Sequence, residues 1–192
     1  DGRASFTLTP EQLKLSGTRI IPVERKTLLK ELRVPGRALG GEGISFQVYE
    51  QDLALIKPGM AFQAEAPMFP GERLAGQITS IESILDPMTR TARVNAVLRQ
   101  RPSQALRAEA SLSGTIEVRL SDVIAVPETA VLHTGTKDLV FIATEDGSFS
   151  PRAVSLGSKT QGFYEIKKGV NAGELISAGP NFLLDSESRI QF

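Results

Sequence analysis

The sequence predicts a mainly β protein of the sandwich or barrel class, with few and short helices. Glycine, proline and small polar residues recur about every 8–12 residues, and the segments between them are short and rich in valine and isoleucine. Within residues 91–98, Arg93 and Asn95 alternate with Val94 and Ala96, which predicts one polar and one apolar face. Both observations are typical of strands that cover a buried core on one side.

Strands are expected along the whole chain. The early ones are residues 18–23 and 28–34, and the later ones extend to the last third of the sequence. Asp146-Gly147 is a favourable pair for a tight hairpin turn between two of the later strands. The remaining expected strands are residues 45–49, 61–66, 74–84, 91–98, 111–120, 123–127, 138–144, 150–156, 164–167 and 174–177.

Two short helices are expected. Thr9 is a suitable N-cap, Pro10 suits a first helical turn, and Gly17 is a suitable end, so the first helix begins near Thr9. The second covers residues 50–55 and ends before Pro58, since proline disfavours helical geometry in the residue before it.

Composition excludes several classes of protein. The 192 residues include 22 Lys and Arg against 22 Asp and Glu, so no net charge favours nucleic acid as a partner. The absence of cysteine excludes disulfides, thiolate metal sites and a cysteine nucleophile, and it suits an oxidising compartment. No apolar run reaches the ~18 residues of a membrane-spanning helix. The sequence starts at Asp1 without a basic and apolar leader, so we expect any leader to have been removed or never to have existed.

No catalytic arrangement emerges, so the sequence predicts a protein that is not an enzyme. His133 is the only imidazole, and no nucleophile elbow, phosphate-binding loop or dinucleotide fingerprint accompanies it. Its simplest interpretation is a loop histidine that follows a strand.

Metal binding rests on four candidate ligands, namely Met60, Met68, Met88 and His133. Thioethers suit Cu(I) and Ag(I), and imidazole suits Zn(II). The competing interpretation of the methionines is that they fill irregular gaps in a core. We therefore expect no cofactor, with weak Cu(I), Ag(I) or Zn(II) binding as the open alternative.

The segment Gly40-Gly41-Glu42-Gly43 has three glycines in four residues. Such a composition has little conformational preference and is typical of a flexible connector. Two interpretations stay open: a segment is missing at this point, or this is a natural glycine-rich turn.

Three stretches together resemble a known family. Phe69-Pro70-Gly71-Glu72 and Asp86-Pro87-Met88-Thr89-Arg90-Thr91 resemble the β-barrel domain of periplasmic adaptor (membrane fusion) proteins of tripartite efflux pumps. IAVPETAVLHTG at residues 124–135 resembles the passage from that barrel into the membrane-proximal domain. GVNAGELISAGPNFLLDSES at 169–188 and FTLTPEQLKLSGTRIIPVE at 6–24 are similar to the heavy-metal branch, the CusB-like members of the HlyD-type adaptors.

The resemblance implies a division of the chain. Residues 1–39 provide the first strands of a membrane-proximal domain that is completed by residues 122–192, and residues 44–121 form a β-barrel domain. The linker 40–43 stands where the family has a lipoyl-like domain and an α-helical hairpin. Residues 99–114, RQRPSQALRAEASLSG, depart from the usual turn before the final barrel strand.

The resemblance also implies a function without catalysis. An adaptor of this kind links an inner-membrane exporter of the resistance-nodulation-division (RND) type to an outer-membrane channel, for efflux of heavy-metal ions. It lies in the periplasm of a Gram-negative bacterium, associates with the membrane through its partners, and packs side by side in a ring. Arg90, between Thr89 and Thr91, is expected to orient the barrel by hydrogen bonding a carbonyl or carboxylate, and Gly71 and Gly169 are expected to be turn residues with positive φ.

Two other functions stay open. One is a periplasmic protein that carries Cu(I), Ag(I) or Zn(II) to the pump. The other is a non-catalytic β module that binds a polysaccharide or peptide, although only 6% of residues are aromatic and tryptophan is absent.

Overall fold

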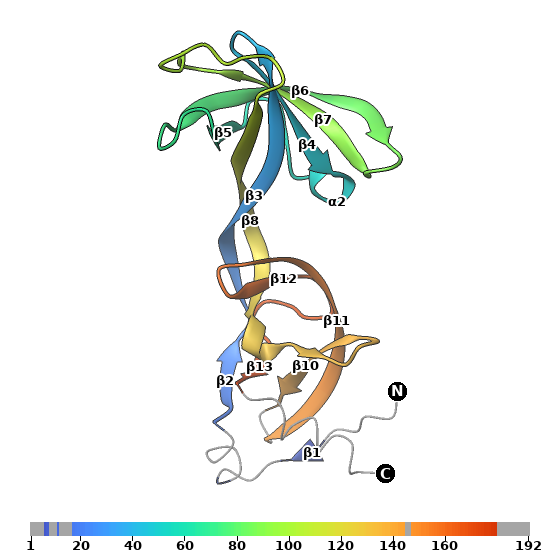
Figure 1. The fold of residues 1–192 in the computed structure, drawn as a ribbon. Coiled ribbons are helices and arrows are strands. Elements are labelled where there is room, and N and C mark those ends of the chain that lie inside the picture. Colours follow the sequence, from blue (N-terminus) through green and yellow to red (C-terminus); the bar gives the residue numbers. More distant parts are fainter. Residues whose placement is uncertain (1–5, 8–10, 12–16, 145–146, 180–192) are drawn as a thin grey trace. The chain divides into compact units, whose positions relative to one another are not determined.

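The structure is a computed structural model, and it describes residues 6–7, 11, 17–144 and 147–179 (Figure 1). It is mainly β, as predicted, and it contains a closed barrel. The barrel strands follow the order β8-β3-β4-β7-β6-β5, and a β5–β8 pairing closes the ring. Tertiary contacts divide the chain into two compact units, residues 29–118 and residues 1–28 with 119–192.

Most expected strands are present close to their expected bounds, and some are longer. The strand β3 (Glu24–Gly40) extends the expected strand 28–34 at both ends, and β8 (Ser111–Pro127) joins the expected strands 111–120 and 123–127. The others are β1 (Phe6–Thr7), β2 (Arg19–Pro22), β4 (Gly43–Tyr49), β5 (Ala61–Glu65), β6 (Leu74–Asp86), β7 (Thr91–Leu98), β9 (Leu132–His133), β10 (Asp138–Ala143), β11 (Ser148–Thr160), β12 (Phe163–Lys168) and β13 (Leu175–Ala178).

The helix expected over residues 50–55 is present as α2 (Glu50–Leu53), and a 3-10 turn covers Glu128–Ala130. The helix expected from Thr9 falls almost entirely outside the described residues. The Asp146 half of the expected turn also lies outside them, while Gly147 has a φ of 79° and β10 and β11 pair as an antiparallel hairpin.

Glycines make room for aromatic rings in the core of unit 29–118. The Phe46 and Phe62 rings meet edge to face with centroids 4.9 Å apart. A Cβ on Gly76 would lie 2.4 Å from the Phe62 ring, and a Cβ on Gly114 would lie 2.4 Å from the Phe46 ring. Only glycine permits this approach of strand backbone and ring.

The other unit has its own core under the sheet β2-β13-β10-β11-β12. Its members are buried aliphatic side chains contributed by several strands. They include Val126, Val140, Ile142, Ile166 and Ile176. Each unit therefore buries an apolar cluster of its own.

The segment 40–43 is a tight hairpin turn in the structure, unlike the flexible connector that its composition suggested. β3 and β4 stay paired as far as Gly40 opposite Gly43, so only Gly41 and Glu42 lie between the strands. Gly40 and Gly41 have φ of 93° and 63°, which glycine adopts without a steric penalty. Residues 29–39 lie in the same unit as the barrel, because β3 supplies one of its six strands.

Residues 99–110 link β7 to β8 and lie close to this turn. Leu106 is buried, with 3% of its surface exposed. The Glu72 carboxylate accepts hydrogen bonds from the Ser103 backbone N–H (2.9 Å) and hydroxyl (2.6 Å). Arg101 contacts Glu42 at 3.0 Å, so the long loop is fixed to the β3–β4 turn.

Candidate docking surfaces

The sequence Asp86–Thr91 builds the tip of the β6–β7 hairpin. Asp86 Oδ1 accepts hydrogen bonds from the backbone N–H groups of Met88 (2.8 Å) and Thr89 (3.2 Å), and the Asp86 carbonyl accepts one from Arg90 N–H (2.8 Å). Aspartate followed by proline favours such a turn, because the carboxylate can bond its own backbone two and three residues on. These hydrogen bonds thus all come from within the short motif.

Arg90 joins the tip to the neighbouring strand. Its φ is 56°, in the left-handed region. Its guanidinium contacts the Glu50 carboxylate, and its carbonyl accepts a hydrogen bond from Glu50 N–H at 3.0 Å. Beside it, the hydroxyls of Thr89 and Thr91 lie 2.8 Å apart. The tip is therefore held from inside the turn and from the start of α2.

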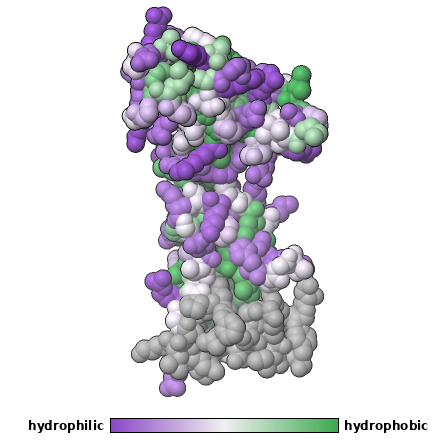
Figure 2. Space-filling model, viewed as in Figure 1, coloured by the Kyte–Doolittle hydropathy of each residue, from purple (hydrophilic) through white to green (hydrophobic). Residues whose placement is uncertain are grey.

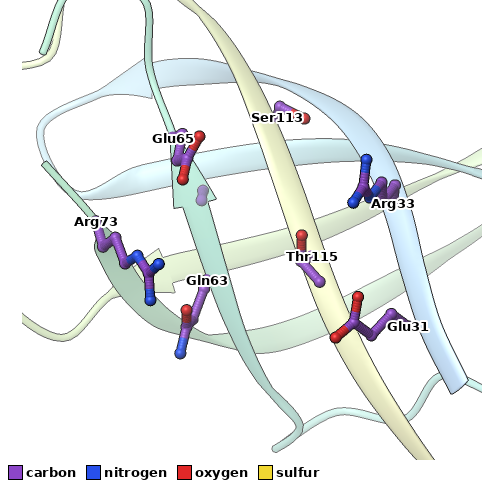
Figure 3. Close-up of a pocket in the computed structure, with 8 residues that line it drawn as sticks. Glu31, Arg33, Gln63, Glu65, Arg73, Ser113 and Thr115 are labelled. Atoms are coloured by element: carbon purple, nitrogen blue, oxygen red, sulfur yellow. The ribbon is translucent and has the colours of Figure 1, made fainter. Parts of the chain in front are cut away.

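A polar groove lies on the outer wall of the barrel (Figure 3). Ser113 and Thr115 on β8 lie between two groups of polar side chains, with Glu31 and Arg33 on one side and Gln63, Glu65 and Arg73 on the other. Its volume is about 380 Å³. An adjoining hollow of about 360 Å³ shares some of these residues and adds Arg99 and Glu117.

Each side of the groove carries an acid and a base, so it suits a neighbour whose charges are also mixed. Sequence reasoning did not single out these residues. The signal was present, since polar residues recur with a period of two at 31 and 33, 63 and 65, and 113 and 115. What the sequence lacked was the pairing that brings three separate strands together.

The candidate thioether ligands do not converge. Met68 follows β5 close to the Leu74 end of β6, whereas Met88 follows the Asp86 end of the same strand. A strand of this length separates its ends by about 40 Å. Met60 lies beside the middle of β6, where its carbonyl accepts a hydrogen bond from Ile78 N–H at 2.9 Å, and its sulfur lies 3.2 Å from Lys57 N.

His133 lies on β9 in the other unit. Its Nδ1 lies 2.6 Å from Asp138 Oδ1, and its Nε2 lies 3.4 Å from the Tyr164 hydroxyl. Within the described ranges, no three His, Cys, Asp or Glu side chains lie close enough to hold a metal ion together.

The two glycines selected from the sequence both have positive φ. Gly71 has φ of 84°, and a Cβ added to it would have no neighbour within 4 Å. Gly169 has φ of 116°, and a Cβ there would lie 2.5 Å from the Ala153 carbonyl oxygen. Gly169 therefore combines an unusual backbone conformation with close packing.

An ion pair fixes the turn that follows Gly169. Glu174 accepts hydrogen bonds from the Arg152 guanidinium (2.6 Å) and from Asn171 N–H (2.7 Å). These two donors, the guanidinium foremost, hold the pKa of the Glu174 carboxyl below its usual value. The turn between β12 and β13 is thus fastened to β11.

Comparison with known proteins assigns each half of the fold to a known domain family. Residues 44–119 match the CusB-like β-barrel domain, and residues 124–185 match the CzcB C-terminal circularly permuted SH3-like domain. The chain is 24% identical to the putative membrane fusion protein SilB of Salmonella typhimurium, over 77% of this chain and 34% of the relative. It is 28% identical to the nickel and cobalt resistance protein CnrB of Cupriavidus metallidurans, over 97% of this chain and 47% of the relative.

A solved structure has the same fold. The crystal structure of ZneB from Cupriavidus metallidurans aligns with a TM-score of 0.52 and 23% identity, over 73% of this chain and 41% of that one. Both halves therefore define a membrane fusion, or adaptor, protein. Residues 44–119 belong to the CusB-like β-barrel domain family and residues 124–185 to the CzcB C-terminal domain family, in agreement with the CusB-like adaptors that the sequence resembles.

The chain spans a third to a half of the length of the curated relatives described above. None of the helices among the described residues has the length and apolar character needed to cross a bilayer.

Proposed function

We propose that this chain acts in the periplasm as the pump-facing part of an adaptor that connects an inner-membrane RND exporter to an outer-membrane channel. The exporter moves heavy-metal ions, and the chain contributes by docking and by packing beside further copies in a ring. It performs no catalysis of its own.

One observation carries this proposal. Two domains that belong to metal-efflux adaptors follow each other in one chain, as residues 44–119 and 124–185, with the fold that those domains have in ZneB. Charged and polar side chains dominate the groove on the barrel wall, which suits protein contacts that fix register.

Binding to the exporter tests the proposal. The RND exporter of the source organism is purified in detergent and passed over the immobilised chain, and the same chain is titrated with Cu(I), Ag(I) and Zn(II) by calorimetry. Saturable binding of the exporter is the expected result. Tight metal binding without exporter binding would instead favour the metal-carrier function.

A further inference from the structure

The most exposed large apolar side chains in the part of the chain that the structure describes lie together in the β6–β7 hairpin. Met88 is 90% exposed and Ile84 is 79% exposed. Tyr49, at the end of β4, is 57% exposed and pairs with Thr91, which in turn pairs with Asp86. Adjacent strands are ~4.8 Å apart, so the backbones of Tyr49 and Asp86 lie ~10 Å apart. Figure 2 shows hydrophobic colouring at the free end of this hairpin.

The exposure of Ile84 follows from the way β6 is built. Ile81 pairs with Val94 and Leu85 with Ala92, so four steps along β6 face only two along β7. The extra residues, among them Ile84, form a bulge, and bulges turn side chains away from the direction that the regular pleat gives them.

The tip is also held by hydrogen bonds and by an ion pair, which matters for its use. The Asp86 carboxylate and carbonyl hold the turn from within, and the Arg90–Glu50 contact ties it to α2. A fixed apolar protrusion loses little conformational entropy when it is bound, so its burial contributes more fully to affinity. An isolated apolar residue on a surface is ordinary, whereas two highly exposed ones in the same hairpin are a candidate contact for a partner.

The charge of the segment narrows the choice of partner. Residues 82–88 include Glu82 and Asp86 and no basic residue, and the charge of Arg90 on the same tip is paired with Glu50. Anionic lipid headgroups would repel such a segment. The barrel-wall groove of a second copy is lined largely by charged and polar side chains, so that groove offers no apolar cleft for this segment.

We propose that Ile84 and Met88 form a docking element that inserts into an apolar cleft with a lysine- or arginine-rich rim on the exporter. The assignment rests on the proposed function, since the exporter is the partner it names. Glu82 and Asp86 give the segment its negative charge and so favour a basic rim, and Tyr49 covers the side of the contact. The Asp86–Thr91 motif therefore builds a contact point as well as a turn.

Paired variants test the docking element. Ile84→Ser with Met88→Ser removes both apolar side chains. Leu39→Ser with Met68→Ser, at residues 50% and 43% exposed on the same unit, is the matched control. Affinity for the detergent-purified exporter is expected to fall about tenfold or more in the tip variant and to stay within about twofold in the control. Binding of the wild type is also expected to weaken as salt increases.

The outcomes separate the two proposals. If the wild type binds the exporter and the tip variant binds equally well, this inference is wrong and the proposed function stands. If the wild type does not bind the exporter, both are wrong.

Photocrosslinking identifies the occupant directly. A benzoylphenylalanine at position 88, in cells that also contain the exporter, is expected to crosslink to the exporter, and the same probe at position 68 is not. Crosslinks from position 88 to a second copy of the chain or to lipid, in place of the exporter, would overturn the assignment.

Discussion

Arg90 carries two opposing effects in one residue. Its left-handed backbone conformation lowers stability, because residues other than glycine rarely adopt it. Its exposed ion pair with Glu50 raises stability. Arg90→Ala loses the ion pair and keeps the backbone conformation, so it is expected to lower the free energy of unfolding by about 0.5–1 kcal/mol. Arg90→Gly relieves the backbone and is expected to be more stable than Arg90→Ala.

Urea unfolding of the three proteins measures these differences. An Arg90→Ala variant as stable as the wild type would show that the guanidinium does not orient the tip.

Gly71 and Gly169 provide a matched comparison of backbone conformation and packing. Gly71→Ala is expected to lower the free energy of unfolding by about 1 kcal/mol, the cost of holding alanine in the left-handed conformation. No packing cost adds to it, because the surroundings of Gly71 are open. Gly169→Ala also places a methyl group against the Ala153 carbonyl, so the expected loss is about 2–4 kcal/mol. Thermal unfolding checks the order, and equal losses would contradict it.

The stability of the fold depends on pH through the Glu174 carboxyl. Because its pKa in the folded protein lies below the usual 4.5, its ion pair stabilises the fold fully above that value. The stabilisation is lost as the pH falls below 4.5 and through the lowered pKa.

Glu174→Gln removes this titration, so its stability is expected to fall less steeply over the same acid range. Urea unfolding at a series of pH values from neutral to about 3 measures the slope. Identical slopes for variant and wild type would be inconsistent with the Arg152–Glu174 interaction described above.

At the scale of elements, the loop over residues 99–110 depends on one buried side chain. Leu106 is almost fully buried, and the contacts around it, Ser103 with Glu72 and Arg101 with Glu42, are exposed and individually weak. Leu106→Ala is therefore expected to cost about 2–4 kcal/mol of unfolding free energy. Ser103→Ala, the control in the same loop, is expected to cost clearly less, because water replaces an exposed hydrogen bond.

Hydrogen exchange of the loop amides, together with urea unfolding, follows both variants. A Leu106→Ala protein with unchanged stability and unchanged exchange would mean that the loop does not depend on this contact.

Local sequence patterns predicted most strands but not their lengths. β3 continues through Pro35 and Gly36, which a sequence pattern treats as an interruption, because its neighbours in the barrel supply the remaining hydrogen bonds. β8 continues past Asp122, whose φ of 55° bends the strand without ending it. Tertiary pairing overrides the local signal at both places.

The candidate site was predictable only in part. The Asp86–Thr91 motif was identified from sequence, but its partner Glu50 lies forty residues away and is brought close only by the β4–β7 pairing. The three methionines looked equivalent in sequence, and only the register of β6 separates them. Long-range register is the information that a period of two does not contain.

At the scale of the whole molecule, each of the two units has its own core, and the charges of the chain balance, with 22 basic and 22 acidic residues. Such a chain has no net field to attract a polyanion and relies on the shape and local chemistry of its surfaces. The barrel-wall groove and the β6–β7 tip are two such surfaces within one unit. Both surfaces suit contacts between proteins.

The most direct test is a structure of the chain bound to the exporter, determined by electron cryomicroscopy of the purified complex. We expect density for the barrel on the periplasmic face of the exporter, with the end of the β6–β7 hairpin in an apolar cleft. Density for the chain elsewhere on the exporter would contradict the docking element, and a mixture in which no complex forms would contradict the adaptor function itself.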